Sequence, residues 1–237
     1  MTHVSRHEAV GTVLLIGASR GLGLAMADEF AQRRWNVVAT VRENARTKLH
    51  ELADEHEGRI EIETLDITEA DQTAALRGRL SDRTFDILFV NAGTANMKDE
   101  TVADVPTDEF ARVLVTNALS PMRVIEELQN LVRVDGLIGV MSSGQGSISD
   151  NMNGRHEIYR CSKSALNQLM RSYAARHSED QRALVLMAPG WTRTDLGGPK
   201  APFSVEESIP KVVDVLVAQR GKPGLAYLDR QGDTVRW

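Results

Sequence analysis

Short runs rich in β-branched residues recur along the chain, and they alternate with longer segments in which apolar residues return every three or four positions. The short runs predict strands, and several are apolar along their whole length, as strands buried on both faces are. The longer segments predict helices over residues 22–34, about 107–133 and 158–177. The predicted strands are Thr12–Ile16, Asn36–Val41, Arg59–Leu65, Phe85–Val90, Leu137–Met141, Arg182–Met187 and Leu225–Leu228.

This alternation predicts a single α/β domain over residues 1–237, with a Rossmann-type, doubly wound parallel sheet of about seven strands and helices on both faces. A chain of 237 residues suits one domain, and it contains no repeat or Pro/Ser-rich linker. Sheets of this kind bind ligands where the carboxyl ends of their strands meet. Functional residues are therefore expected directly after the strands.

Composition narrows the classes of function. Apolar residues make up 42% of the chain and charged residues 26%, and the formal net charge of −5 is spread along the sequence. We therefore expect neither a nucleic-acid nor a membrane partner. The single cysteine, Cys161, excludes an intrachain disulfide and favours a cytoplasmic location. No cluster of residues has metal-ligand spacing, so no metal is expected.

Three glycines follow the first predicted strand, and the chain then enters a helix. Glycines let the backbone turn tightly and approach a diphosphate, while the helix N-terminus supplies free N–H groups. A glycine-rich turn used only for packing is the alternative, but the place of these glycines between a strand and an amphipathic helix favours nucleotide binding. The cofactor-binding candidates here are Gly17, Ser19, Arg20, Gly21, Leu22 and Gly23.

The end of the second strand distinguishes the two nicotinamide dinucleotides. An NAD site usually has an acidic residue there for the ribose 2′-OH, whereas this chain has Arg42. The guanidinium groups of Arg20 and Arg42 suit a ribose 2′-phosphate, so NADP(H) is predicted and NAD(H) is less favoured. Two alternatives stay open: Arg42 as a solvated loop residue, and Glu43 at the ribose if the strand ends one residue later.

Tyr159 and Lys163 are four positions apart and lie on one face of the third predicted helix. A lysine ammonium at that distance favours the tyrosinate, so Tyr159 could exchange a proton with a carbonyl or an alcohol near neutral pH. The pair alone is weak support, because such pairs are common on helix surfaces. Ser142 and Ser143 follow the fifth strand, where hydroxyls can hydrogen-bond a reacting oxygen or simply close a turn.

With Asn91-Ala92-Gly93 after the fourth strand and Pro189-Gly190 after the sixth, the sequence resembles the short-chain dehydrogenase/reductase family across nearly the whole chain. The resemblance implies that Tyr159 is the general acid/base, that Lys163 holds the nicotinamide ribose and lowers the pKa of Tyr159, and that Ser143 orients the substrate carbonyl. It also assigns Asn117 to a water relay toward the lysine, Asp66 to the adenine and Thr194 to the carboxamide. The other implied cofactor-binding residues are Asn91, Ala92, Gly93, Pro189, Gly190 and Thr192.

The segment after Pro189 and the ending at Trp237 are similar to the C-factor-like and small carbonyl-reductase-like branch. This implies an NADPH-dependent oxidoreductase that acts on a small-molecule carbonyl or alcohol and forms a homodimer or homotetramer. An NADP(H)-binding sensor without turnover stays open, and an epimerase or dehydratase is less favoured because the C-terminal region is short. Met97, Met152, Trp191 and Phe203 are candidates for an apolar substrate pocket or for the core.

Overall fold

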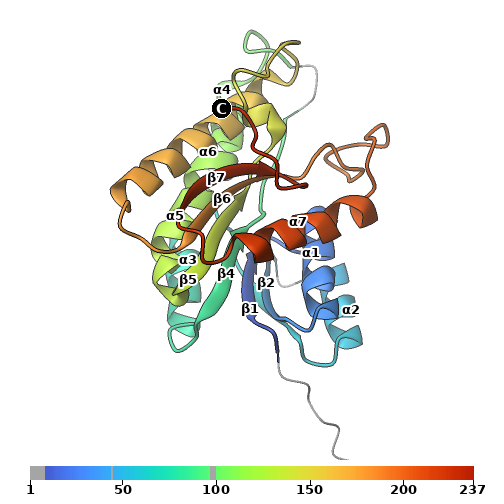
Figure 1. Cartoon of the computed structure of the whole chain (residues 1–237). Coiled ribbons are helices and arrows are strands. Elements are labelled where there is room, and N and C mark those ends of the chain that lie inside the picture. The colour runs from blue at the N-terminus through green and yellow to red at the C-terminus, as the bar shows by residue number, and fades with distance from the viewer. Residues whose placement is uncertain (1–8, 44, 97–99) are drawn as a thin grey trace, which may run out of the picture.

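A seven-stranded sheet in which every neighbouring pair is parallel forms the centre of the protein (Figure 1). This computed structural model describes residues 9–43, 45–96 and 100–237. The strand order β3-β2-β1-β4-β5-β6-β7 reverses direction between β1 and β4, which confirms the predicted doubly wound fold class. The strands are β1 (Thr12–Ile16), β2 (Asn36–Val41), β3 (Ile60–Thr64), β4 (Phe85–Val90), β5 (Val132–Met141), β6 (Ala183–Ala188) and β7 (Gly224–Asp229).

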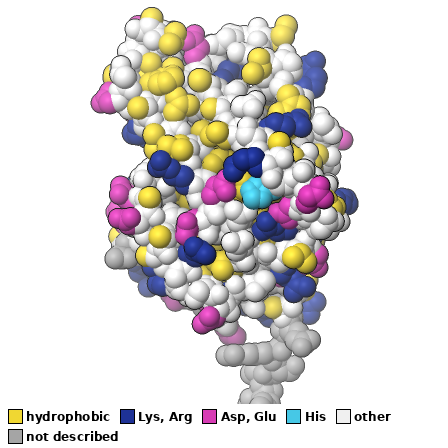
Figure 2. Space-filling model, turned by 90° about the vertical axis from the view of Figure 1, so that its left-hand side faces the viewer, with side chains coloured by type: hydrophobic (Ala, Val, Ile, Leu, Met, Phe, Trp, Pro, Cys, Tyr) yellow, Lys and Arg dark blue, Asp and Glu magenta, His cyan; other side chains and the backbone are white. Residues whose placement is uncertain are grey.

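Helices cover both faces of the sheet. Figure 1 shows α1, α2 and α7 on one face and α3, α4, α5 and α6 on the other. Figure 2 looks onto the second of these layers, where hydrophobic side chains gather in the upper half and charged side chains predominate in the lower half. The helices are α1 (Gly21–Gln32), α2 (Lys48–Glu55), α3 (Ala70–Arg79), α4 (Thr107–Leu114), α5 (Ser120–Leu128), α6 (Glu157–Arg176) and α7 (Val205–Gln219).

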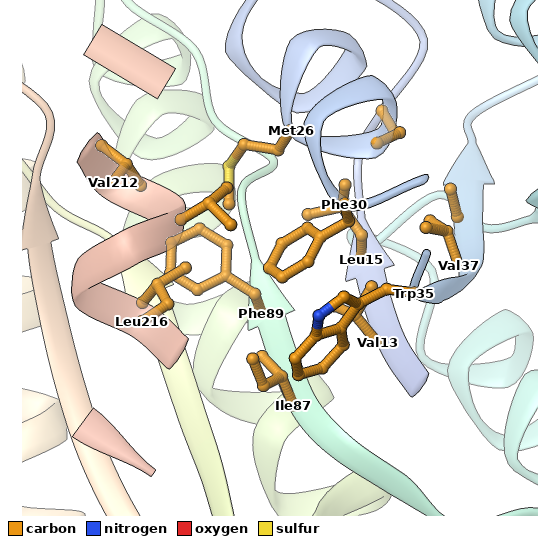
Figure 3. Close-up of a cluster of buried hydrophobic side chains, with 14 of the residues drawn as sticks. Val13, Leu15, Met26, Phe30, Trp35, Val37, Ile87, Phe89, Val212 and Leu216 are labelled. Carbon is orange, nitrogen blue, oxygen red and sulfur yellow. The ribbon is translucent and has the colours of Figure 1, made fainter. Parts of the chain in front are cut away.

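The core beneath α1 and α7 holds β1 and α1, the two elements that flank the glycine loop, in place. In Figure 3, Met26 and Phe30 of α1 and Leu216 of α7 converge on Phe89 of β4. These side chains are all fully buried. Burying a residue of this size contributes about 1.5–3 kcal/mol, so the cluster fixes the start of α1 against the sheet.

The predicted helix over residues 107–133 is interrupted. After α4 comes a π-helical segment, η1 (Val115–Leu119), then α5 and a short 3-10 turn, η2 (Gln129–Leu131). Pro121 explains the interruption, because proline has no N–H to donate to the carbonyl of Asn117 and its ring crowds that carbonyl. The N–H of Ser120 instead donates to the carbonyl of Val115, which gives the wider turn.

The fifth strand is longer than predicted. It begins at Val132 and not at Leu137, and its pairing with β4 shifts register between Phe85 and Ile87. The exposed stretch from Arg133 to Asp135 lacks the apolar pattern of the buried strand, so the sequence pattern detected only the buried half.

Candidate active site

The glycine loop between β1 and α1 is fixed by its neighbours on the sheet. The N–H of Gly17 donates to Thr40 Oγ1 at 2.9 Å, and Asn91 Nδ2 donates to the Gly17 carbonyl at 2.7 Å. Gly17 has φ of +88°, which favours glycine. A Cβ on Gly23 would lie 2.5 Å from Asn91 Nδ2 and closer still to the Gly17 carbonyl oxygen. The loop therefore needs glycine at both positions.

The loop and the start of α1 form a cradle that fits a diphosphate. Arg20 occupies the N-cap position, and its side chain makes no capping hydrogen bond to the first N–H groups of α1. Gly21 lies opposite Thr194, whose methyl group would be 3.8 Å from a Cβ at Gly21. Ser19 is half-buried, and Leu22 packs against the core, which anchors the helix start. The predicted contact between Thr194 and the cofactor is compatible with this placement.

Arg20, before the start of α1, and Arg42, directly after β2, both keep exposed guanidinium groups. Arg20 pairs with Asp195 at 3.4 Å, and Arg42 pairs with its neighbour Glu43 at 3.5 Å. All four side chains are mostly exposed, so these pairs are worth little and can exchange for another anion. Thr40, which the sequence analysis did not single out, ties the end of β2 to the loop through its hydroxyl and its carbonyl.

Tyr159 and Ser143 come together at the carboxyl edge of the sheet. Ser143 directly follows β5 and Ser142, and Tyr159 lies in the first turn of α6. Burial raises the pKa of Tyr159 to about 12, and the side chain of Ser143 acts in the opposite direction. Tyr159 is therefore protonated near neutral pH in this structure.

Lys163 lies one turn further along α6 and is 3% exposed. Its Nζ donates to the carbonyl of Met141 at 2.9 Å and lies 5.7 Å from the centre of the Tyr159 ring. Burial lowers the pKa of Lys163 to about 8. The predicted lowering of the Tyr159 pKa by this lysine is not what the structure shows, because desolvation acts on the tyrosine more strongly than any charge near it.

Asn117 is fully buried in the π-helical segment and joins three parts of the site. Its Oδ1 accepts from the N–H of Thr94 at 2.8 Å, and its Nδ2 donates to the Thr94 carbonyl at 2.8 Å and to Ser162 Oγ at 2.9 Å. A Cβ on Gly93 would lie 3.3 Å from Asn117 Oδ1 and 3.6 Å from Lys163 Nζ. Asn117 thus ties the end of β4 to the helix that carries Tyr159 and Lys163.

The remaining predicted cofactor residues lie along the same edge. Ala92 packs against Gly17, and Gly190 adopts φ of +81° after Pro189. Asp66 accepts from the N–H and hydroxyl of Thr68 in a turn after β3. The Thr192 hydroxyl is buried and donates to Ser208 Oγ of α7 at 3.2 Å, so that hydroxyl is engaged in the packing of α7.

The four candidate pocket residues differ in their surroundings. Met97 lies outside the described residues. Met152 and Trp191 are exposed, at 88% and 54%. Phe203 packs over Gly190 and beneath the guanidinium of Arg230, 3.6 Å from its ring centre, so it supports the turn after β6.

The described ranges contain neither a group of side chains suited to a metal ion nor a helix suited to span a membrane. Among residues 9–43, 45–96 and 100–237, no three His, Cys, Asp or Glu side chains are grouped so that they could bind a metal ion. In the same ranges, none of the helices combines the length with the apolar composition that crossing a bilayer requires.

Comparison with known proteins identifies the family. Residues 11–203 match the family model of short chain dehydrogenases. C-signal of Myxococcus xanthus is 32% identical over 154 residues, which cover 64% of this chain and 92% of that protein. A Burkholderia multivorans protein described as a short-chain dehydrogenase/reductase, crystallised with bound NADP, superposes with a TM-score of 0.94 at 61% identity, covering 95% of this chain and 99% of that one.

A carbonyl reductase from Pseudomonas aeruginosa PAO1 in complex with NADP superposes with a TM-score of 0.87 at 33% identity, again covering 95% of this chain and 99% of that one. These relatives, C-signal and a carbonyl reductase, confirm the predicted resemblance to the C-factor-like and small carbonyl-reductase-like branch. The chain belongs to the short-chain dehydrogenase/reductase family, whose members are oxidoreductases that act on small molecules.

Proposed function

We propose that the protein is an NADPH-dependent carbonyl reductase with Ser143, Tyr159 and Lys163 at its reacting centre. The observation that carries the proposal is the grouping at the sheet edge of Ser143, whose side chain lowers the pKa of Tyr159 against burial, with Tyr159 and the buried Lys163, whose Nζ lies 5.7 Å from the Tyr159 ring centre. This cluster lies on the same edge as the glycine cradle. The two structural relatives with bound NADP support the choice of cofactor.

Each residue then has a chemical task. The bound nicotinamide supplies the hydride that reduces the carbonyl carbon. The Ser143 hydroxyl and the Tyr159 hydroxyl hydrogen-bond the carbonyl oxygen, where negative charge develops, and Tyr159 gives that oxygen its proton. A raised pKa keeps this proton on Tyr159 near neutral pH. Asn117 holds the end of β4 against the helix that carries the tyrosine. Lys163, whose Nζ lies 5.7 Å from the centre of the Tyr159 ring, is placed to contact the nicotinamide ribose.

Arg20 and Arg42 are proposed to bind the ribose 2′-phosphate. Both guanidinium groups are exposed, and each has only a weak, solvent-exposed carboxylate partner that a phosphate can displace. Asn91, Ala92 and Gly93, with Pro189, Gly190 and Thr194, would line the rest of the cofactor's path. Asp66 is kept as the residue at the adenine, and Thr192 would contribute through its backbone because its hydroxyl is buried elsewhere.

The decisive experiment measures NADPH oxidation by the purified protein against a panel of aldehydes, ketones and quinones. Wild type should turn over, whereas Tyr159→Phe should bind NADPH with unchanged affinity and lose at least about 100-fold in kcat. Tyr173→Phe is the matched control, since Tyr173 is another tyrosine of α6, fully buried, whose hydroxyl donates to Gln129 Oε1 at 2.6 Å. Tight NADPH binding without turnover on any carbonyl would favour the alternative, an NADP(H)-binding signalling protein.

The cofactor assignment has its own test. Arg42→Leu and Arg20→Leu should each raise KM for NADPH about tenfold or more and leave KM for NADH nearly unchanged. Arg46→Leu is the control, because Arg46 is an equally exposed arginine that pairs with Asp54 at 2.7 Å on α2. Equal effects on both cofactors would place the arginines away from the 2′-phosphate.

We further propose that the chain acts as one unit over residues 1–237, in the cytoplasm, as a homodimer or homotetramer. The hydrophobic area in the upper half of Figure 2 supports association. In addition, Leu119 of η1 and Leu169 of α6 are each 39% exposed. Light scattering coupled to gel filtration measures the assembly. A monomer at micromolar concentration would contradict this proposal.

A further inference from the structure

A buried tyrosine outside the proposed reacting centre contacts the backbone of Ser143. Tyr227 of β7 is 1% exposed, and its hydroxyl donates to the carbonyl oxygen of Ser143. The sheet register brings it there: Tyr227 is paired with Leu186 of β6, and Leu186 is paired with Val140, three residues before Ser143. The contact therefore joins the edge strand β7 to the loop that carries the proposed active-site hydroxyl.

A buried hydrogen bond fixes the neighbouring Ser142. The Ser142 hydroxyl donates to Asn167 Oδ1 at 2.6 Å, and both side chains are buried. Burial raises the pKa of Tyr227, and the side chains of Asn167 and Ser142 act in the opposite direction. Asn167 Nδ2 in turn donates to the carbonyl of Gly146 at 3.3 Å. This network keeps the first serine turned inward, so that the second serine is the one that faces Tyr159.

Ser143 is consequently held at several points. Its carbonyl accepts from the N–H of Gly146 at 2.8 Å as well as from Tyr227, and its hydroxyl accepts from the N–H of Gln145 at 3.1 Å. The turn from 143 to 146 alone would leave the residue free to swing with that turn. The bond from Tyr227 comes from a different element, and it therefore fixes the turn relative to the sheet.

Tyr227 itself is held by the C-terminal segment. The rings of Tyr227 and Trp237 lie 5.5 Å apart at 58°, and Arg171 of α6 covers the Trp237 ring at 4.1 Å. The Trp237 carbonyl oxygen accepts from Ser149 Oγ at 2.7 Å, near the middle of the same loop. The loop between β5 and α6 is thus tied to β7 near its start and to the segment after β7 further along.

We propose that Tyr227 is a positioning residue: by holding the Ser143 carbonyl, it fixes the Ser143 hydroxyl against Tyr159. The proposal rests on the proposed function of Ser143 and Tyr159. Tyr227 contacts neither substrate nor cofactor in this assignment, and it acts only through Ser143. Hydroxyl placement within a few tenths of an ångström matters for proton transfer, so loosening this residue should slow turnover without weakening cofactor binding.

The test compares Tyr227→Phe with Tyr173→Phe. Each variant keeps its ring and loses one buried hydroxyl, and Tyr173 donates to Gln129 Oε1 at 2.6 Å, away from Ser143. We expect Y227F to lose about tenfold in kcat with KM for NADPH unchanged, and Y173F to change neither. Equal effects of the two variants on kcat would overturn the proposal.

A double-mutant cycle shows whether the effect runs through Ser143. In a Ser143→Ala background, Y227F should cost nothing further in kcat, because the hydroxyl that it positions is already gone. A full, additive loss in that background would mean that Tyr227 acts by another route, and the proposal would be wrong.

A readout without turnover separates this proposal from the proposed function. The chain has three tyrosines, so labelling the ring Cζ with ¹³C gives at most three resonances. Y227F should move the Tyr159 resonance toward its position in S143A, and Y173F should leave it unmoved. If the wild type reduces no carbonyl, the proposed function fails, yet this comparison can still be made. A Tyr159 resonance that shifts in S143A and stays fixed in Y227F would overturn the positioning role.

Discussion

Replacing Lys163 with methionine measures the cost of burying a charge beside the reacting groups. Lys163 is 3% exposed, and burial lowers its pKa from 10.5 to about 8. Each pKa unit corresponds to about 1.4 kcal/mol, so the folded state loses about 3 kcal/mol by keeping this ammonium charged near neutral pH. Methionine has a similar length and no charge, so K163M is free of that cost.

The variant also loses a hydrogen bond. Lys163 Nζ donates to the Met141 carbonyl at 2.9 Å, and leaving that buried acceptor unpaired costs about 1–2 kcal/mol. The net expectation at about pH 7 is that K163M has a free energy of unfolding about 1–2 kcal/mol higher than wild type. The same variant should have lost its turnover, because the proposed ribose contact is gone.

The pH dependence gives the sharper test. The pKa of Lys163 is lower in the folded state than in the unfolded state, so the wild type gains stability as pH rises from about 8 to about 10.5. K163M lacks this gain, so its advantage should shrink and turn into a deficit of about 1–2 kcal/mol at the alkaline end. Urea unfolding of both proteins, followed by tryptophan fluorescence, measures the difference at each pH. A difference that stays constant across this range would refute the reasoning.

Three further substitutions have effects that can be predicted from the contacts of one residue each. Gly23→Ala would place a Cβ 2.5 Å from Asn91 Nδ2, so NADPH affinity in a fluorescence titration should fall at least about tenfold, whereas Gly78→Ala, with open space around it, should bind normally. Asn117→Ala removes three hydrogen bonds and should lower the free energy of unfolding by about 3 kcal/mol; a loss below about 1 kcal/mol in urea would contradict this. Asp86→Asn weakens a partly buried pair with Arg220 at 2.5 Å and should cost about 2 kcal/mol in the same assay; because Asp86 is the second residue of β4, at the opposite edge of the sheet from the site, a fall in kcat would count against this assignment.

The strands were predictable because burial on both faces leaves an uninterrupted apolar run. The predicted strand Asn36–Val41 coincides with β2. Helices were less regular. The sequence pattern did not single out α3, since only Thr73 and Leu76 of this helix are buried, which is too few for a clear helical repeat. It also did not single out α7, whose interior contains Pro210. Pro121 was a local signal for the break before α5 that periodicity alone overlooks.

Residues of the site were predictable where the backbone itself imposes a requirement. Gly17 and Gly23 had to be glycine, and the structure shows the close contacts that require it. Thr40 and Tyr227 were not predicted, because their contacts with the glycine loop and with Ser143 come from register between strands far apart in sequence. A threonine or a tyrosine in a buried strand looks like an ordinary core residue until that register is known.

Burial shifts the pKa values of Tyr159 and Lys163 in opposite directions, yet for both side chains it favours the neutral form. It raises the pKa of Tyr159 to about 12 and lowers that of Lys163 to about 8, and both shifts favour the neutral form. The spacing of the lysine and the tyrosine in the sequence predicts how their charges interact. It does not show how strongly burial removes water from both side chains. Reduction of a carbonyl would therefore begin with the proton already on Tyr159. In the same low-dielectric surroundings, a positive charge near Tyr159 would lower its pKa more strongly than it could in water, so the occupants of the pocket determine when that proton is released.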